Sequence, residues 1–209
     1  MTTIIFSGGT PPHPGITSVL PADRHVIAAD SGMDHALALG IEVDLLVGDL
    51  DSVRPESIAL AKKVERHPWD KDVTDLELAL LAALDRGEPT LVVAGGGGRL
   101  DHLAAEFAVL ASPRWAALDL QIWMGPNMLL PVHSGQCRAV DGAYGATVTL
   151  LAVLGPATGV TTTGLRWALD DATLLPDSTR GVSNVLTEPL ATIEVKEGVV
   201  VVVVPDVWT

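Results

Sequence analysis

Short apolar runs that end at glycine or aspartate recur through the first 125 residues, and helix-patterned segments separate them. The runs are short and apolar, as expected for buried strands. The predicted strands cover residues 3–6, 25–29, 45–47, 90–94 and 119–124, and the predicted helices cover residues 33–39, 55–63, 75–84 and 99–111. Strands that alternate with helices predict a parallel α/β sheet covered on both faces.

The pattern changes after Gly125-Pro126, where Gly and Pro separate short strand-like segments without a helical pattern. Glu197-Gly198 is typical of a tight hairpin turn. The second half therefore predicts a small antiparallel sandwich or barrel. The strand-like segments are 128–132, 136–140, 147–153, 160–163, the neighbourhood of 174, 191–196 and 199–204.

The composition excludes some function classes. The chain has 26 acidic and 13 basic residues and a formal net charge of −13, which argues against a nucleic-acid partner. The apolar run 199–204 is too short to span a bilayer, and the N-terminus has a strand pattern that a signal peptide lacks. Cys137 is the only cysteine, so no intramolecular disulfide is possible, which fits the cytoplasm.

Carboxylates gather after the predicted strands. Asp49 and Asp51 follow the run 45–47 directly, at the end of a strand where an open α/β sheet places its ligand site. Mg²⁺ prefers such oxygen ligands, and the sequence has neither a Cys/His cluster for zinc nor a Walker A motif. Thr74 and Glu77 form a capping box, and Asp72 lies before it, so helix capping gives no reason for a carboxylate at Asp72. Asp75 has an alternative role, because a negative charge stabilises the positive end of a helix dipole.

Two further segments fit a phosphate ligand. The four glycines 95–98 let a backbone approach a ligand closely, and Arg99 can fork onto phosphate oxygens at a helix start. A flexible loop with a capping Asp101 is the alternative. Asp30 lies where a strand gives way to a helix, which suits an N-cap and a functional carboxylate equally.

Together, Gly48-Asp49-Leu50-Asp51-Ser52, Asp72-Val73-Thr74-Asp75 and Gly97-Gly98-Arg99-Leu100-Asp101-His102 resemble the motifs of the thiamine pyrophosphokinase family. The resemblance implies a Rossmann-like α/β catalytic domain at 1–125 that binds ATP and Mg²⁺, and a β-sandwich at 126–209 that binds thiamine. It implies transfer of a diphosphoryl group from MgATP to the thiamine hydroxyl, giving thiamine diphosphate and AMP.

The resemblance also implies roles for single residues. Asp49, Asp51 and Asp72 would bind Mg²⁺, with Asp75 in support. Arg99 would hold phosphates, and Asp101 would orient or deprotonate the hydroxyl. The residues implied to bind the nucleotide are Asp30, Ser52, Gly97, Gly98, Arg99 and His102.

In the second half, Gly164–Leu169 and Gly181-Val182-Ser183-Asn184 resemble family segments at a thiamine pocket formed across a homodimer. Ser183, Asn184 and Trp167 would contact thiamine. A plain turn at Ser183-Asn184 and a core position for Trp167 are the alternatives.

The sequence departs from the family at Glu106, where Asn is usual, and at Val185, where an acidic residue is common. Two other functions stay open: a Mg²⁺-dependent phosphotransferase for another heteroaromatic alcohol, and a non-catalytic protein that binds thiamine or a nucleotide.

Overall fold

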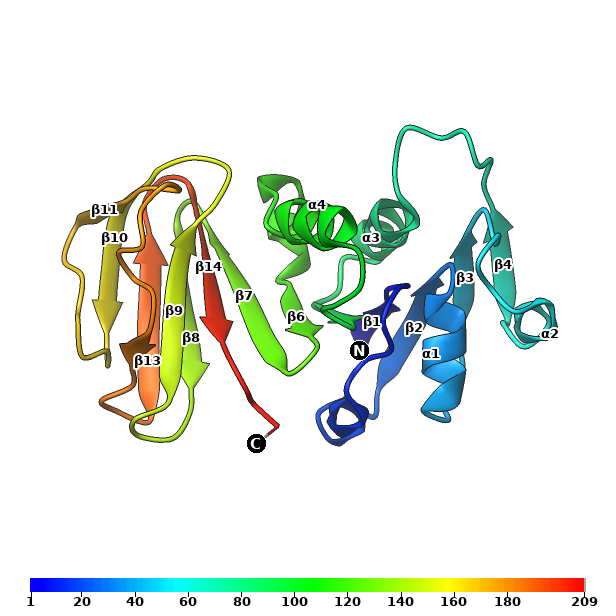
Figure 1. The fold of residues 1–209 in the computed structure, drawn as a ribbon, viewed down its shortest axis with the longest axis horizontal. Helices are drawn as coiled ribbons and strands as arrows, with labels where there is room; N and C mark the ends of the chain where they lie inside the picture. The colour runs from blue at the N-terminus through cyan, green and yellow to red at the C-terminus, as the bar shows by residue number, and fades with distance from the viewer. Residues whose placement is uncertain (209) are drawn as a thin grey trace. The chain divides into compact units, whose positions relative to one another are not determined.

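The computed structural model describes residues 1–208, which divide into two compact units (Figure 1). Unit 1 comprises Met1–Glu106, Ala117–Pro126 and Trp208, and unit 2 comprises Phe107–Ala116 and Asn127–Val207. Among these described residues, no helix combines the length and apolar character needed to cross a membrane.

Unit 1 contains a parallel sheet with the strand order β6-β5-β1-β2-β3-β4. Its strands are β1 (Thr2–Phe6), β2 (Arg24–Ala29), β3 (Leu45–Gly48), β4 (Lys63–Arg66), β5 (Thr90–Ala94) and β6 (Gln121–Met124). Parallel pairing brings the carboxyl ends of all these strands to one edge of the sheet. Because β1, β2, β3 and β5 are almost continuously apolar, both faces of the sheet need cover.

Helices cover both faces of this sheet (Figure 1). The helices of the described chain are α1 (Gly32–Ala38), α2 (Pro55–Ile58), α3 (Asp75–Arg86) and α4 (Leu100–Leu110), with 3₁₀ turns η1 (Pro14–Ser18) and η2 (Pro113–Leu118), and of these α1 and α3 contact the strands of the parallel sheet. Side chains alternate along a strand, so Ile4 and Phe6 share one face and pack in one cluster with Met33 of α1. α3 contacts β1, β2 and β3, and Figure 1 shows it on the opposite face.

The predicted capping box of α3 is confirmed. The Thr74 hydroxyl accepts from the Glu77 backbone N–H, the Glu77 carboxylate accepts from the Thr74 N–H, and the helix ends at Gly87 in the left-handed conformation with φ 66°.

The predicted helix over 55–63 is too long. α2 ends at Ile58, and Lys63 is already the first residue of β4. The backbone N–H groups of Lys62 and Lys63 donate to Val43 and Asp44, so pairing with the sheet takes the hydrogen bonds that a longer helix would use.

Besides the end of α4 and most of η2, unit 2 contains two sets of antiparallel strands, with strand orders β12-β9-β14-β7 and β11-β10-β13-β8. Apolar side chains from both sheets form one core, including Leu150 and Val202 from the first sheet and Val160 and Ile193 from the second. The strands are β7 (Asn127–His133), β8 (Gln136–Asp141), β9 (Thr147–Ala152), β10 (Ala157–Thr163), β11 (Ala172–Leu174), β12 (Asn184–Val185), β13 (Leu190–Val195) and β14 (Val199–Val204). The sandwich interpretation and the α/β fold class are confirmed. The predicted hairpin at Glu197-Gly198 is wrong, because β13 pairs with β8 and β10 whereas β14 pairs with β7 and β9.

Candidate functional site

Three carboxylates meet at the carboxyl edge of the parallel sheet. One oxygen each from Asp30, Asp49 and Asp51 lies within 4.8 Å of the other two. Ala29 at the end of β2 pairs with Val47 near the end of β3, so the loops that follow these strands are neighbours. Leu50 has φ 66° and a buried side chain, which anchors the loop in the core between Asp49 and Asp51.

Mutual repulsion and burial mark this group, which we call the acidic group. Burial raises the pKa of Asp30, and the charges of Asp75 and Asp51 raise it further, although backbone N–H groups of Ser31 and Ser52 oppose the shift. Ser52 also donates its hydroxyl to Asp51 Oδ1 at 2.8 Å. A cation placed among these oxygens would relieve the repulsion.

Lys71 bridges Asp49 and Asp75. Its Nζ lies 2.7 Å from Asp49 Oδ2 and 3.0 Å from Asp75 Oδ1, and only 12% of its side chain is exposed. The hydrogen bond from Lys71 lowers the pKa of Asp49, although burial opposes the shift. Burial acts to lower the pKa of Lys71, but the hydrogen bond to Asp49 and the ion pair with Asp75 outweigh it and raise the pKa above its usual value.

Lys71 was not among the residues predicted for the site. The signal for it was its spacing, since Lys71 and Asp75 are four residues apart. That spacing alone does not reveal the second partner of Lys71, which is Asp49 in the loop after β3.

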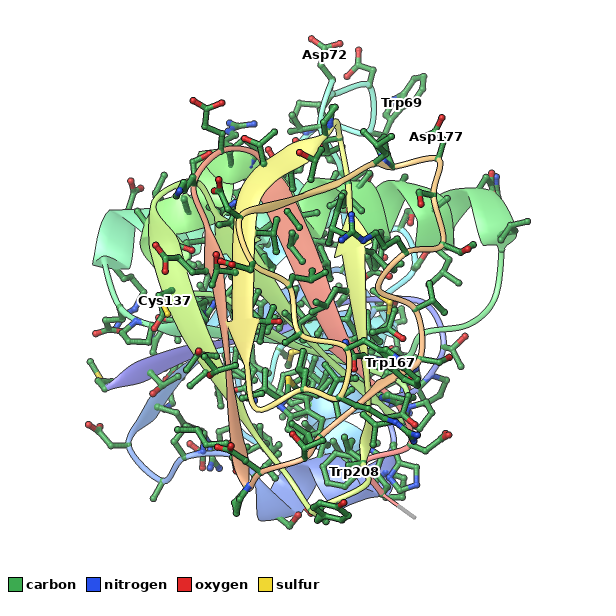
Figure 2. All side chains as sticks on the ribbon, turned by 90° about the vertical axis from the view of Figure 1, so that its left-hand side faces the viewer. Trp69, Asp72, Cys137, Trp167, Asp177 and Trp208 are labelled. Atoms are coloured by element: carbon green, nitrogen blue, oxygen red, sulfur yellow. The ribbon has the colours of Figure 1, made fainter. Side chains whose placement is uncertain are left out.

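Asp72 is not part of the acidic group. It is exposed on the loop between β4 and α3, and Figure 2 shows its carboxylate at the edge of the molecule, on the same loop as Trp69. The expected partner of Asp49 and Asp51 is thus replaced by Asp30 in this structure. The role of Asp72 as a metal ligand stays a prediction.

The glycine-rich loop packs tightly against the loop after β1. A Cβ on Gly95 would lie 1.8 Å from the Thr10 carbonyl oxygen, so no other residue fits there without a shift of the backbone. Gly96 and Gly98 have φ of 68° and 92°, which other residues rarely adopt. Gly97 and Gly98 are exposed, as a ligand-binding loop requires.

Arg99 and Asp101, which the sequence assigned to separate roles, pair with each other. Arg99 Nε lies 3.1 Å from Asp101 Oδ1, and Arg99 Nη2 lies 2.5 Å from Asp101 Oδ2. This hydrogen bonding lowers the pKa of Asp101 to about 2. Both side chains and the neighbouring His102 are exposed.

Glu106 belongs to a polar cluster at the end of β1 that the sequence did not reveal. The Ser7 hydroxyl donates to Glu106 Oε1 at 2.7 Å, and the Ser7 carbonyl lies 3.1 Å from His35 Nδ1. Burial raises the pKa of Glu106, against the effects of the Ser7 hydrogen bond and of His102. Glu106, where the family usually has Asn, therefore places a partly buried acid beside the carboxyl edge of the sheet.

Unit 2 has a cavity of about 330 Å³ that contains two predicted thiamine contacts. Its lining residues are Trp167, Ala168, Leu169, Arg180, Gly181, Val182 and Asn184. Trp167 is 56% exposed, so it is not a core residue, and the Arg166 guanidinium lies 5.1 Å from the centre of its ring.

Asn184 is buried, and its amide is bonded to backbone. Its Oδ1 accepts from the N–H groups of Trp167 at 3.1 Å and Val185 at 2.9 Å, and its Nδ2 donates to the Trp167 carbonyl at 2.9 Å. Asn184 therefore holds Trp167 in place. Ser183 is exposed with φ 57°, and its N–H donates to Thr149 Oγ1 at 3.0 Å.

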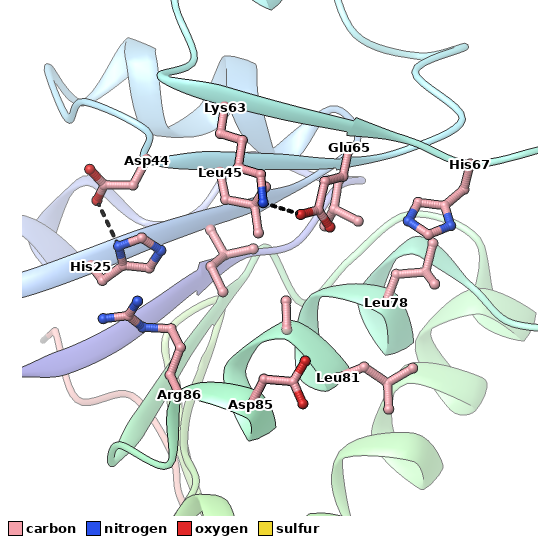
Figure 3. Close-up of a pocket in the computed structure, with 13 residues that line it drawn as sticks. His25, Asp44, Leu45, Lys63, Glu65, His67, Leu78, Leu81, Asp85 and Arg86 are labelled. Carbon is pink, nitrogen blue, oxygen red and sulfur yellow. Dashed lines mark hydrogen bonds and ion pairs between the residues drawn. The ribbon is translucent and has the colours of Figure 1, made fainter.

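A second cavity, of about 510 Å³, lies in unit 1 between α3 and strands β2 to β4 (Figure 3). Both apolar and ionisable side chains line it, and some of the ionisable ones lie close to one another. Lys63 lies 2.6 Å from Glu65, and His25 lies 3.5 Å from Asp44. None of the residues predicted for the site lines this cavity.

Two family models match the chain. The model described as thiamin pyrophosphokinase, catalytic domain, matches residues 16–124, and the one described as thiamin pyrophosphokinase, vitamin B1 binding domain, matches residues 137–200.

Individual relatives carry the same name. Thiamine pyrophosphokinase 1 of Oryza sativa subsp. japonica is 29% identical over 69% of this chain, and the chain spans only 60% of that relative's length. Thiamine pyrophosphokinase of Bacillus subtilis (strain 168) is 25% identical over 97% of this chain and 98% of its own length. The crystal structure of thiamine pyrophosphokinase from Bacillus subtilis superimposes with a TM-score of 0.84 at 21% identity, covering 98% of this chain and 99% of the other.

Proposed function

Because this chain belongs to the thiamin pyrophosphokinase family, we propose that it is a thiamine diphosphokinase. It transfers a diphosphoryl group from ATP to the hydroxyl of thiamine, giving thiamine diphosphate and AMP. The observation that carries this proposal is the acidic group of Asp30, Asp49 and Asp51 at the carboxyl edge of the sheet, where α/β proteins bind their ligands. We assign the nucleotide to residues 1–125 and thiamine to residues 126–209.

The acidic group fits Mg²⁺ because it offers only carboxylate oxygens, the ligands that this ion prefers. We assign Asp49 and Asp51 as ligands, with Asp72 as the third predicted ligand and Asp30 and Asp75 in support. When bound, the ion would neutralise negative charge on the phosphate oxygens.

Residues of the glycine-rich loop would hold the nucleotide. Gly97 and Gly98 let the backbone approach the phosphates, and His102 and Ser52 add polar contacts. Arg99 would break its ion pair with Asp101 and bind phosphate oxygens instead. Both side chains of the pair are exposed, so breaking it costs little free energy.

Asp101 would orient the thiamine hydroxyl. A carboxyl group with a pKa of about 2 stays ionised at neutral pH and accepts a hydrogen bond well, but it is a weak proton acceptor. We therefore favour orientation over deprotonation as its role.

Thiamine would bind in the cavity beside Trp167. The Trp167 indole is 56% exposed, and the nearby Arg166 guanidinium is one cation that its ring already attracts, so a cationic heteroaromatic ring would use the part of the indole that Arg166 does not cover. Ser183 supplies a hydroxyl, and Asn184 positions the indole. We propose further that the chain forms a homodimer with the thiamine site at the subunit interface, and that it works in the cytoplasm.

The test is thiamine-dependent release of AMP from ATP and Mg²⁺ by the purified chain, with thiamine diphosphate identified by mass spectrometry. We expect Asp51→Asn to lower kcat by roughly 100-fold or more, as for loss of one charge-stabilising group. Asp72→Asn is compared with Asp70→Asn, which changes an exposed neighbour on the same loop. Near-normal turnover of Asp51→Asn or Asp72→Asn would remove that residue from the metal site, and a folded chain that forms no AMP would refute the function.

A further inference from the structure

Lys71 joins two elements through partly buried carboxylates. The side chains of Lys71, Asp49 and Asp75 are 12%, 16% and 22% exposed, and the carboxylates come from the loop after β3 and the start of α3. Lys71 Nζ also lies 3.3 Å from the Pro68 carbonyl. Such an ion pair is shielded from salt and held in one geometry, unlike an exposed pair such as Lys63–Glu65.

Asp49 is shared between this ion pair and the acidic group. Its Oδ2 accepts from Lys71 at 2.7 Å, while its Oδ1 accepts from the Asp51 backbone N–H at 3.2 Å. A divalent cation bound by Asp49 would therefore lie within a few ångströms of the ammonium. Two cations at one carboxylate repel each other, so they compete for it.

We propose that Lys71 is a positioning residue that holds Asp49 in place while no divalent cation is bound, and that its ammonium moves to a phosphate oxygen once Asp49 engages the cation. The inference rests on the proposed function for the identity of the phosphate ligand. Asp75 keeps the ammonium beside the site during this exchange, because it holds the same Nζ independently of Asp49.

The first test measures the affinity for Mn²⁺ alone, without nucleotide, by electron paramagnetic resonance of the free ion. Lys71→Gln should bind Mn²⁺ roughly tenfold more tightly, the size expected for removing a unit charge about 5 Å from a divalent ion in a water-like dielectric. Lys71→Arg keeps the charge and should bind Mn²⁺ as the wild type does.

Lys62→Gln is the matched control. Lys62 also bridges two carboxylates of unit 1, lying 2.9 Å from Asp44 and 3.4 Å from Glu42, but it is 60% exposed and outside the acidic group. It changes the net charge equally, so its Mn²⁺ affinity measures the effect of charge at a distance. We expect less than about a twofold change for this variant, because salt screens distant charges.

The second test measures binding of α,β-methylene-ATP at saturating Mn²⁺, by calorimetry. Lys71→Gln should weaken this binding roughly tenfold, since the ammonium that would contact the phosphate is absent. A purely structural role predicts a loss of both affinities, whereas the proposal predicts that they change in opposite directions.

Weaker or unchanged Mn²⁺ binding by Lys71→Gln, or a gain matched by Lys62→Gln, would overturn the inference. Absence of Mn²⁺ binding by the wild type would also overturn it, and unchanged nucleotide binding would overturn the transfer to phosphate. Failure of the proposed function is seen separately, because a chain that shows the opposite changes yet forms no AMP from thiamine keeps the role of Lys71 and loses the activity.

Discussion

Replacing Asn184 by alanine removes three hydrogen bonds from a residue that is 3% exposed. A typical hydrogen bond contributes about 1 kcal/mol, so the three contribute about 3 kcal/mol. Trp167 is exposed, so water can replace part of the bonding to its backbone. We therefore expect Asn184→Ala to lower the free energy of unfolding of unit 2 by about 2 to 3 kcal/mol, with weaker thiamine binding as a consequence.

The assay is urea denaturation together with hydrogen exchange followed by mass spectrometry. The variant should lose protection at the amides of Trp167 and Val185, which donate to Asn184 Oδ1 in the wild type. Ser183→Ala is the matched control, because it changes an exposed hydroxyl on the adjacent residue. It should weaken thiamine binding while the unfolding free energy stays within about 0.5 kcal/mol of the wild type.

An Asn184→Ala variant that keeps the stability and the amide protection of the wild type but loses thiamine binding would contradict this prediction. Asn184 would then act by touching the ligand itself, and the backbone bonds would be incidental.

Two other predictions concern unit 1. Trp208 stacks on Trp123 with centroids 4.7 Å apart, so Trp208→Ala should cost about 2 kcal/mol in urea denaturation, whereas Trp69→Ala, at an 82% exposed position, should cost nothing measurable. Burial raises the pKa of Glu106 above 4.5, so the folded state holds this proton more tightly than the unfolded state does, and stability is lost as the pH rises through the raised pKa. Glu106→Gln keeps an acceptor for Ser7 and should reduce this pH dependence, and an unchanged pH profile of the unfolding free energy would contradict the burial of the acid.

Local pattern was sufficient for most of the fold. Apolar runs that end at glycine or aspartate predicted every parallel strand except β4, whose residues Lys63–Arg66 are mostly polar. Thr74 with Glu77 predicted the start of α3, because helix capping depends on neighbouring residues. The prediction failed for the helix after Pro55. There the backbone of Lys62 and Lys63 pairs with Val43 and Asp44, a competition that the local sequence does not show.

The candidate site, like the fold, has features that the sequence predicts and features that depend on the tertiary structure. The sequence alone determined which residue types follow the strand ends, and so it named Asp49, Asp51, the glycine-rich loop and Arg99. Only the tertiary structure decided which of them meet: Asp30 joins the acidic group, Asp72 lies on an exposed loop, and Lys71 bridges two elements. The physical reason is that charge pairing depends on distances of a few ångströms between loops, and those distances are set by strand pairing and packing far from the residues themselves.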